Sequence, residues 1–273
     1  DDAARRDFTI NALYADPETF EISDFFGGMA DLAARRVRFI GDARQRIRED
    51  HLRILRYFRF QARFGSLHAD AEAEAACSDL AATLKGLSRE RIGMELLNLL
   101  SLPDPAPTLA RMAELGITAV ILPEADPAAL AALVEHERGQ DIAPDAVRRL
   151  AALLPADVAL AEAVAARFRL SGAQKRRLAL SAGRDGADAA PRALAYRLGI
   201  EAALDRLLIA GRDASALRDW AIPVFPLKGG QIVAAGIKAG PEVARTLQAV
   251  EARWLAEEFP DEARVHAILG EEL

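Results

Sequence analysis

The chain has 273 residues, of which 51% are apolar, and its 35 basic and 41 acidic side chains give a formal net charge of −6. This apolar content excludes intrinsic disorder, and the length exceeds what one hydrophobic core usually organises, so we expect two or more packed units. No apolar run approaches the length of a membrane-spanning helix, so no membrane partner is expected. The single cysteine, Cys77, excludes a disulfide framework and is typical of a cytoplasmic protein.

The first forty residues predict a small β structure. Alternating residues at 8–14 and 20–24, separated by a turn at 16–19, predict a β-hairpin. A short helix is expected around residues 29–36 and a brief strand at 37–40. Because the chain starts in charged sequence without an initiator Met or a signal-peptide pattern, we expect it to be the remainder of a longer one.

Beyond Gly41 the sequence predicts helices almost throughout. Asp42 and Asp70 are candidate N-caps, and apolar residues at helical spacing predict one continuous helix over residues 48–64. Further helices are predicted at 71–83, 89–100, 108–115, 127–137, 146–154, 158–169, 174–182, 191–198 and 241–259. The predicted fold class is therefore mostly α with a small β remnant.

Positive charge is concentrated in residues 33–66, which hold ten arginines and three acidic residues and so carry a net charge of +7. The planar fork of arginine binds phosphates and base edges through two parallel hydrogen bonds. Three acidic residues are too few to neutralise ten arginines, so this segment is predicted to bind anions rather than to form an ion-paired surface.

Within the predicted helix 48–64, Asp50, Arg53 and Arg56 are expected to lie inside an arc of about 120°. A carboxylate beside an arginine matches the edge of cytosine or adenine, because Asp50 accepts from the amino group while Arg53 donates to a ring acceptor. Uracil and guanine present the reverse polarity and would leave buried groups unpaired. The pair therefore predicts selection of C and A, although the same spacing occurs by chance on many helices.

Four motifs occur in order within the first hundred residues: RRDFTINA (5–12), DFFGG (24–28), EDHLRILRYFRF (49–60) and SRERIGME (88–95). This run resembles the class II tRNA nucleotidyltransferases, which comprise the bacterial CCA-adding enzymes and their poly(A) polymerase relatives. The resemblance implies addition of C, C and A to the tRNA 3′ end from CTP and ATP without a nucleic-acid template. It also implies a C-terminal remnant of the nucleotidyltransferase head (1–42), a helical neck (43–102), a helical body (103–222) and a tail (223–273).

Residue roles follow from the same resemblance. Arg6 would contact the nucleotide or its phosphates, with help from Asn11. Asp50 and Arg53 would read the base edge, in agreement with the polarity argument above. Arg56 and Arg59 would complete the nucleotide pocket.

The family's head begins with a G-G-x-x-R-D segment and a D-x-D strand that hold the triphosphate and Mg²⁺, and neither occurs in this chain. Asp1, Asp2 and Asp7 do not replace them, because they flank the hairpin instead of projecting from one strand face. No catalytic or metal-binding residue is therefore expected in residues 1–273, and the Mg²⁺ ligands are expected upstream of residue 1. The 273-residue chain is predicted to be inactive alone, while the full-length protein is an enzyme.

Several alternatives stay open. A bacterial poly(A) polymerase would use the same pocket, although the chain ends in EEL without a long basic extension, which favours CCA addition. Enzymes that add only A or only CC are also compatible with the motifs. A non-catalytic helical RNA-binding module would use residues 33–66 for phosphates, whereas a purely structural scaffold leaves the arginines unexplained.

Overall fold

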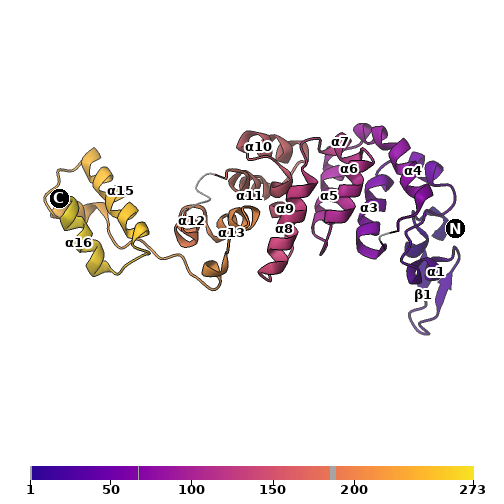
Figure 1. The fold of residues 1–273 in the computed structure, drawn as a ribbon, viewed down its shortest axis with the longest axis horizontal. Coiled ribbons are helices and arrows are strands. Elements are labelled where there is room, and N and C mark those ends of the chain that lie inside the picture. Colours follow the sequence, from indigo (N-terminus) through magenta and orange to yellow (C-terminus); the bar gives the residue numbers. More distant parts are fainter. Residues whose placement is uncertain (1, 67, 185–188) are drawn as a thin grey trace. The chain divides into compact units, whose positions relative to one another are not determined.

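The computed structural model describes residues 2–66, 68–184 and 189–273. The chain divides into two compact units, Asp1–Arg184 and Asp185–Leu273 (Figure 1). Across the described residues the elements are helices apart from one two-stranded sheet, which confirms the predicted fold class. In the same part of the chain, no helix is both long and apolar enough to cross a membrane. The division into head remnant, neck, body and tail stays a prediction.

The first unit begins with short elements. Two 3₁₀ turns, Ala3–Arg5 and Thr9–Asn11, precede β1 (Leu13–Ala15), which pairs antiparallel with β2 (Ile22–Asp24), and α1 (Gly28–Ala33) follows. The hairpin is confirmed. Residues 8–12, which were predicted to belong to its first strand, do not form a strand, and β1 begins only at Leu13. Asn11 closes the Thr9–Asn11 turn by accepting the Phe8 N–H at 3.2 Å. The strand predicted at 37–40 is reduced to a single bridge between Phe8 and Phe39.

The rest of the first unit is a stack of helices. They are α2 (Ala43–Glu49), α3 (Arg53–Phe64), α4 (Ala71–Asp79), a 3₁₀ helix (Ala81–Gly86), α5 (Arg89–Leu100), α6 (Ala106–Glu114), α7 (Ile117–Ile121), α8 (Pro127–Gly139), α9 (Ala146–Leu153), α10 (Val158–Arg167) and α11 (Gly172–Ala182). The carboxylates of Asp42 and Asp70 cap α2 and α4, as predicted. α3 packs against α5 and α6, and α6 against α8 (Figure 1).

The predicted continuous helix over residues 48–64 is wrong. α2 ends at Glu49, and Asp50 leaves the helical region with φ −152° and ψ 106°. Its carboxylate accepts the Leu52 N–H at 3.1 Å, and such a local bond offers the backbone an alternative to a continuous helix. Asp50 therefore lies in a turn before α3 and does not share the helical arc of Arg53 and Arg56.

An aromatic cluster fixes the N-terminal segment on α3. The ring centroids of Phe8 and Phe39 are 4.9 Å apart, and Phe39 stacks on Tyr57 of α3 at 5.7 Å. All three side chains are fully buried. Aromatic burial of this kind is among the largest apolar contributions to packing, so residues 7–9 are held firmly against α3.

A buried ion cluster joins α8 and α9 to the end of α5. Arg148 and Arg149 donate to the two carboxylate oxygens of Glu137 at 2.7 and 2.8 Å, and all three side chains are buried. Arg149 also donates to the carbonyl oxygen of Leu100 at 2.7 Å. The cluster satisfies carbonyl groups at the end of α5, where a helix lacks its own donors.

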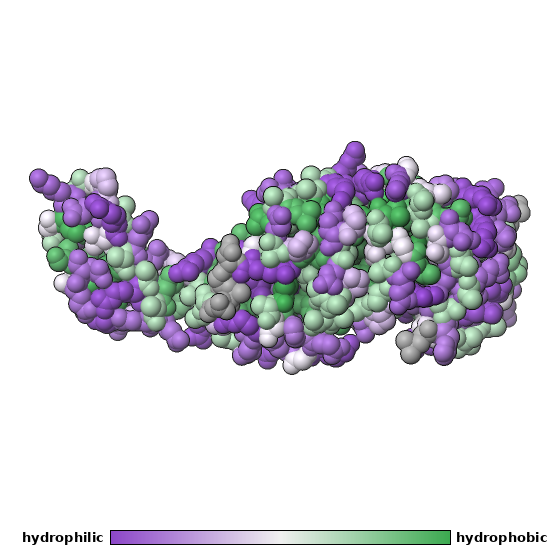
Figure 2. Space-filling model, turned by 45° about the horizontal axis from the view of Figure 1, so that its top comes forward, coloured by the Kyte–Doolittle hydropathy of each residue, from purple (hydrophilic) through white to green (hydrophobic). Residues whose placement is uncertain are grey.

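The second unit contains α12 (Pro191–Leu198), α13 (Ile200–Ile209), a 3₁₀ turn (Ser215–Leu217), α14 (Gly229–Ala234), α15 (Pro241–Ala256) and α16 (Glu262–Glu272). Trp254 is buried at its core and donates through Nε1–H to the Pro260 carbonyl oxygen at 2.9 Å. The view in Figure 2 shows a largely hydrophilic surface interrupted by smaller apolar areas.

Candidate nucleotide-binding site

Seven of the ten arginines in residues 33–66 pair with carboxylates. The pairs are Arg36–Asp31, Arg38–Asp31, Arg44–Asp79, Arg46–Glu49, Arg53–Glu49, Arg56–Asp7 and Arg59–Glu95. The interpretation that acidic residues are too few to pair these arginines is therefore wrong. Four of the five carboxylates come from parts of the chain outside the segment, and folding brings them to it.

Arg46 and Arg53 hold two successive carbonyl groups of the RRD segment, residues 5–7. Arg53 donates to the Arg5 carbonyl oxygen at 3.2 Å, and Arg46 donates to that of Arg6. Glu49 accepts from both guanidinium groups at 2.6 Å, and its hydrogen bond with Arg53 holds the pKa of the Glu49 carboxyl below its usual value. The side chain of Arg53 is only 14% exposed. This arrangement fixes the RRD segment relative to α2 and α3.

Asp7 is the third residue of the RRD segment and binds α3. Its buried carboxylate accepts from Arg56 Nε at 2.5 Å and from the Asn11 side-chain amide at 2.5 Å. Burial by itself would raise the pKa of Asp7, but the hydrogen bond and charge of Arg56 outweigh it and lower the pKa. Asp7 is therefore ionised at neutral pH and holds Arg56 in place.

α5 forms the other side of the site. Glu95 accepts from Arg59 Nε at 2.7 Å and lies 3.8 Å from Arg56 Nη1. One turn earlier on the same face, Arg91 Nη2 donates to Asp50 Oδ2 at 2.9 Å. The side chains of Asp50 and Arg91 are 36% and 48% exposed.

Four of the five predicted nucleotide-binding residues are connected through these contacts: Asp50, Arg53, Arg56 and Arg59. The side chain of Arg6 pairs instead with Asp2 at 2.9 Å, and only its carbonyl group contacts the cluster. Sequence reasoning missed Arg91, although it lies in the recognised SRERIGME motif, because no role had been given to that motif. Asp1 lies outside the described residues.

The site offers an exposed carboxylate acceptor beside guanidinium donors, which suits a base edge. It does not fit a metal ion. Among the described residues, no group of three or more His, Cys, Asp or Glu side chains is placed to hold one. No step involving Mg²⁺ is therefore derived from this chain.

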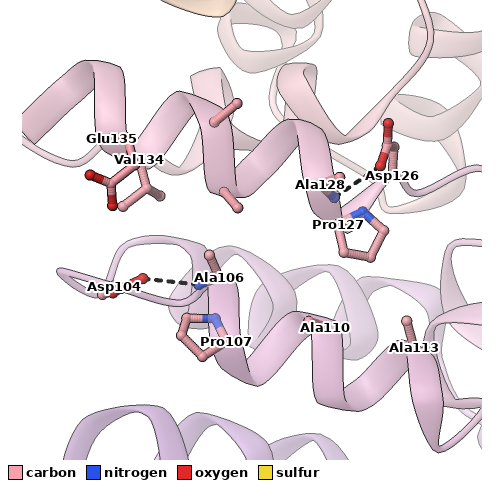
Figure 3. Close-up of a pocket in the computed structure, with 12 residues that line it drawn as sticks. Asp104, Ala106, Pro107, Ala110, Ala113, Asp126, Pro127, Ala128, Val134 and Glu135 are labelled. Carbon is pink, nitrogen blue, oxygen red and sulfur yellow. Dashed lines mark hydrogen bonds between the residues drawn. The ribbon is translucent and has the colours of Figure 1, made fainter.

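Two hollows in the first unit have linings that do not include Asp50 or the arginines around it. One, of about 770 Å³, lies between α6 and α8 and is lined mainly by alanines and prolines, with Asp104, Asp126 and Glu135 also at its walls (Figure 3). The other, of about 940 Å³, lies beside the end of α3 and is more polar, with Arg35, His68 and Arg111 among its lining residues. Neither hollow is lined by Asp50, Arg53, Arg56 or Arg59.

Two family models match parts of the chain. Residues 1–38 match a family described as "Poly A polymerase head domain", and residues 66–129 match "Probable RNA and SrmB- binding site of polymerase A". The CCA tRNA nucleotidyltransferase 1 of Danio rerio is 32% identical over 273 residues, covering 93% of this chain. The chain is similar to tRNA nucleotidyltransferases and poly(A) polymerases. Poly(A) polymerase I of Haemophilus influenzae is 37% identical over 122 residues, which are 45% of this chain.

Solved structures show a similar fold. The CCA-adding enzyme of Bacillus stearothermophilus in complex with CTP is 26% identical with a TM-score of 0.71, and the match covers 99% of this chain and 73% of that enzyme. The CCA-adding enzyme of Thermotoga maritima complexed with tRNA has the same fold, at 21% identity and a TM-score of 0.71, over 99% of this chain and 72% of that enzyme. The chain spans 62% of the Danio rerio relative and 27% of the Haemophilus influenzae relative.

Proposed function

We propose that this chain supplies the nucleotide-selecting and RNA-binding parts of a tRNA nucleotidyltransferase that adds CCA to tRNA 3′ ends from CTP and ATP without a template. The observation that carries this proposal is the part-exposed Asp50 carboxylate, which lies between the N-terminal end of α3 and Arg91 of α5. An acceptor beside arginine donors pairs with cytosine and adenine and is mismatched to uracil and guanine. The similarity to tRNA nucleotidyltransferases and the CTP complex of a relative support the same substrate class.

Arg53 can serve a base while it holds the head remnant. A guanidinium has five N–H donors. Arg53 gives both Nη1 hydrogens to Glu49 and the Arg46 carbonyl oxygen and one Nη2 hydrogen to the Arg5 carbonyl oxygen. Two donors remain uncommitted among the described residues. We assign Arg53 to the ring acceptor of the base, Asp50 to its amino group, and Arg6, Arg56 and Arg59 to the nucleotide around it.

Mg²⁺ is proposed as the cofactor of the whole enzyme, with its ligands in the part of the relatives that this chain does not span. The 273-residue chain alone is then expected to transfer no CMP. Incubation of the chain with labelled CTP and a tRNA that lacks CCA tests this expectation. Any labelled tRNA formed in proportion to the chain added would contradict it.

tRNA is proposed as the macromolecular partner. Residues 66–129 match a family described as a probable RNA-binding site, and a relative has been solved with tRNA. The cytoplasm is proposed as the compartment, because the single cysteine is buried and unpaired.

The activity is tested in the full-length protein with tRNAs that lack CCA, end in C, or end in CC, each supplied with CTP or ATP alone. The proposal predicts C added to the first two and a single A added to the third. A second candidate, poly(A) polymerase, is favoured by the similarity to Poly(A) polymerase I and predicts repeated addition of A to any RNA 3′ end. An enzyme that adds only A, or only CC, would extend only some of these three tRNAs. RNA binding that weakens with salt, without incorporation, would support the non-catalytic RNA-binding module.

A further inference from the structure

The pair formed by Asp50 and Arg91 joins the turn before α3 to α5, and no established role accounts for it. Arg91 lies four residues before Glu95, so both side chains project from one face of α5. Glu95 is buried against Arg56 and Arg59, which fixes that face of α5 against α3. Arg91 consequently stands at a defined position beside Asp50.

Arg91 and the turn together determine where the Asp50 carboxylate points. Oδ2 accepts from Arg91 at 2.9 Å, and Oδ1 accepts from the Leu52 N–H at 3.1 Å. Each carboxylate oxygen accepts two hydrogen bonds, so one further acceptor position remains on each. With one bond fixed on either oxygen, the carboxylate loses its rotational freedom and presents those remaining positions in one direction.

We propose that Arg91 is a positioning residue for base selection: it orients the Asp50 carboxylate so that its free acceptor positions meet the amino group of cytosine or adenine. The proposal rests on the proposed function, because it requires that Asp50 reads the base. Arg91 is suited to this role because its side chain is nearly half exposed and, among the described residues, its hydrogen bond is to Asp50 alone. Without Arg91, the Asp50 carboxylate is free to rotate. The penalty for binding uracil then decreases, because that penalty arises when a fixed acceptor of Asp50 faces an acceptor of the base.

The test measures kcat/KM for CTP and for UTP in the full-length protein, with a tRNA that lacks CCA as acceptor. Arg91→Ala is expected to lower the CTP-to-UTP ratio by roughly tenfold, since one well-formed contact to a base edge discriminates by about that factor or more. Arg91→Lys keeps the cation but not the fork, and is expected to recover part of the ratio. Arg169→Ala is the matched control, because it removes another arginine that pairs with α5, at Glu90, and should leave the ratio unchanged.

A double-mutant cycle separates this proposal from the proposed function. If Arg91 acts through Asp50, then Arg91→Ala has no further effect on the ratio in an Asp50→Ala background. A parent-like ratio in Arg91→Ala, with a lowered ratio in Asp50→Ala, would overturn the positioning role and leave base reading by Asp50 intact. An equal decrease in kcat/KM for CTP and for UTP in Arg91→Ala would show that Arg91 has only a structural role. A parent-like ratio in Asp50→Ala would refute the base-reading function itself.

Discussion

Removal of the Asp7 carboxylate should destabilise the first unit without affecting the second. In Asp7→Ala the Arg56 guanidinium loses its closest acceptor and keeps Glu95 at 3.8 Å, while the Asn11 amide loses its acceptor at 2.5 Å. Breaking a buried ion pair costs about 3–5 kcal/mol. Because the side chain of Arg56 is 31% exposed and water replaces part of the lost interaction, we expect a loss of about 2–3 kcal/mol.

The two units can be followed separately in one urea titration. Both tryptophans, Trp220 and Trp254, lie in the second unit, so tryptophan fluorescence reports on that unit, whereas far-ultraviolet circular dichroism reports on both. The circular dichroism transition of the first unit should move to lower urea in Asp7→Ala, and the fluorescence transition should stay in place. Asp79→Ala is the matched control, because its pair with Arg44 is exposed and such pairs contribute about 0–1 kcal/mol. A loss in Asp7→Ala no larger than in this control would refute the reasoning.

The same carboxylate predicts an acid dependence. Because Arg56 holds the pKa of Asp7 below its unfolded value, Asp7 contributes stability above the unfolded pKa of about 3.9, and this contribution is lost as the pH falls through the lower folded value. The parent should therefore lose more stability than Asp7→Asn between pH 5 and that lower folded pKa. If the free energy of unfolding fell equally steeply with pH in the two proteins over that range, the lowered pKa of Asp7 would be contradicted.

Three further changes test the packing, each by urea denaturation. Glu137→Ala leaves two buried guanidinium groups without their carboxylate and should cost about 3–5 kcal/mol, against about 0–1 kcal/mol for the exposed Glu135→Ala on the same helix. Gly93→Ala should cost about 1–3 kcal/mol, because its Cβ would lie 2.6 Å from the Phe168 Cβ. Trp254→Phe leaves the Pro260 carbonyl without its donor and should cost about 1–3 kcal/mol in the second unit, followed through the fluorescence of the remaining tryptophan. Parent-like stability in any of these variants would contradict the contact it removes.

Local signals in the sequence predicted most of the helices, but not α7, α13, α14 or α16. Asp42 and Asp70 cap their helices as expected, since an N-cap depends on the few residues that follow it. The same local chemistry misled the prediction at Asp50, where apolar spacing indicated one continuous helix. The bond from the Leu52 N–H to the Asp50 carboxylate ends that helix, and apolar periodicity does not contain this information.

The partners of the arginines could not be predicted from a window of sequence. Asp79, Glu95 and Asp7 pair with Arg44, Arg59 and Arg56 across 35, 36 and 49 residues. These pairs depend on which helices pack together, and a count of charges within one segment cannot foresee that. The motif predicts Asp50, Arg53, Arg56 and Arg59 as site residues, and their role stays a prediction. Arg91 becomes a candidate only when the packing of α5 beside α3 is seen.

The central claim is that the Asp50 carboxylate selects cytosine and adenine. The most direct measurement is the ratio of kcat/KM for CTP to that for UTP in the full-length protein, compared between the parent and Asp50→Ala, with Asp79→Ala as a control for loss of an exposed carboxylate. The account predicts that Asp50→Ala lowers this ratio at least tenfold and that Asp79→Ala leaves it unchanged. A ratio in Asp50→Ala equal to that of the parent would contradict it.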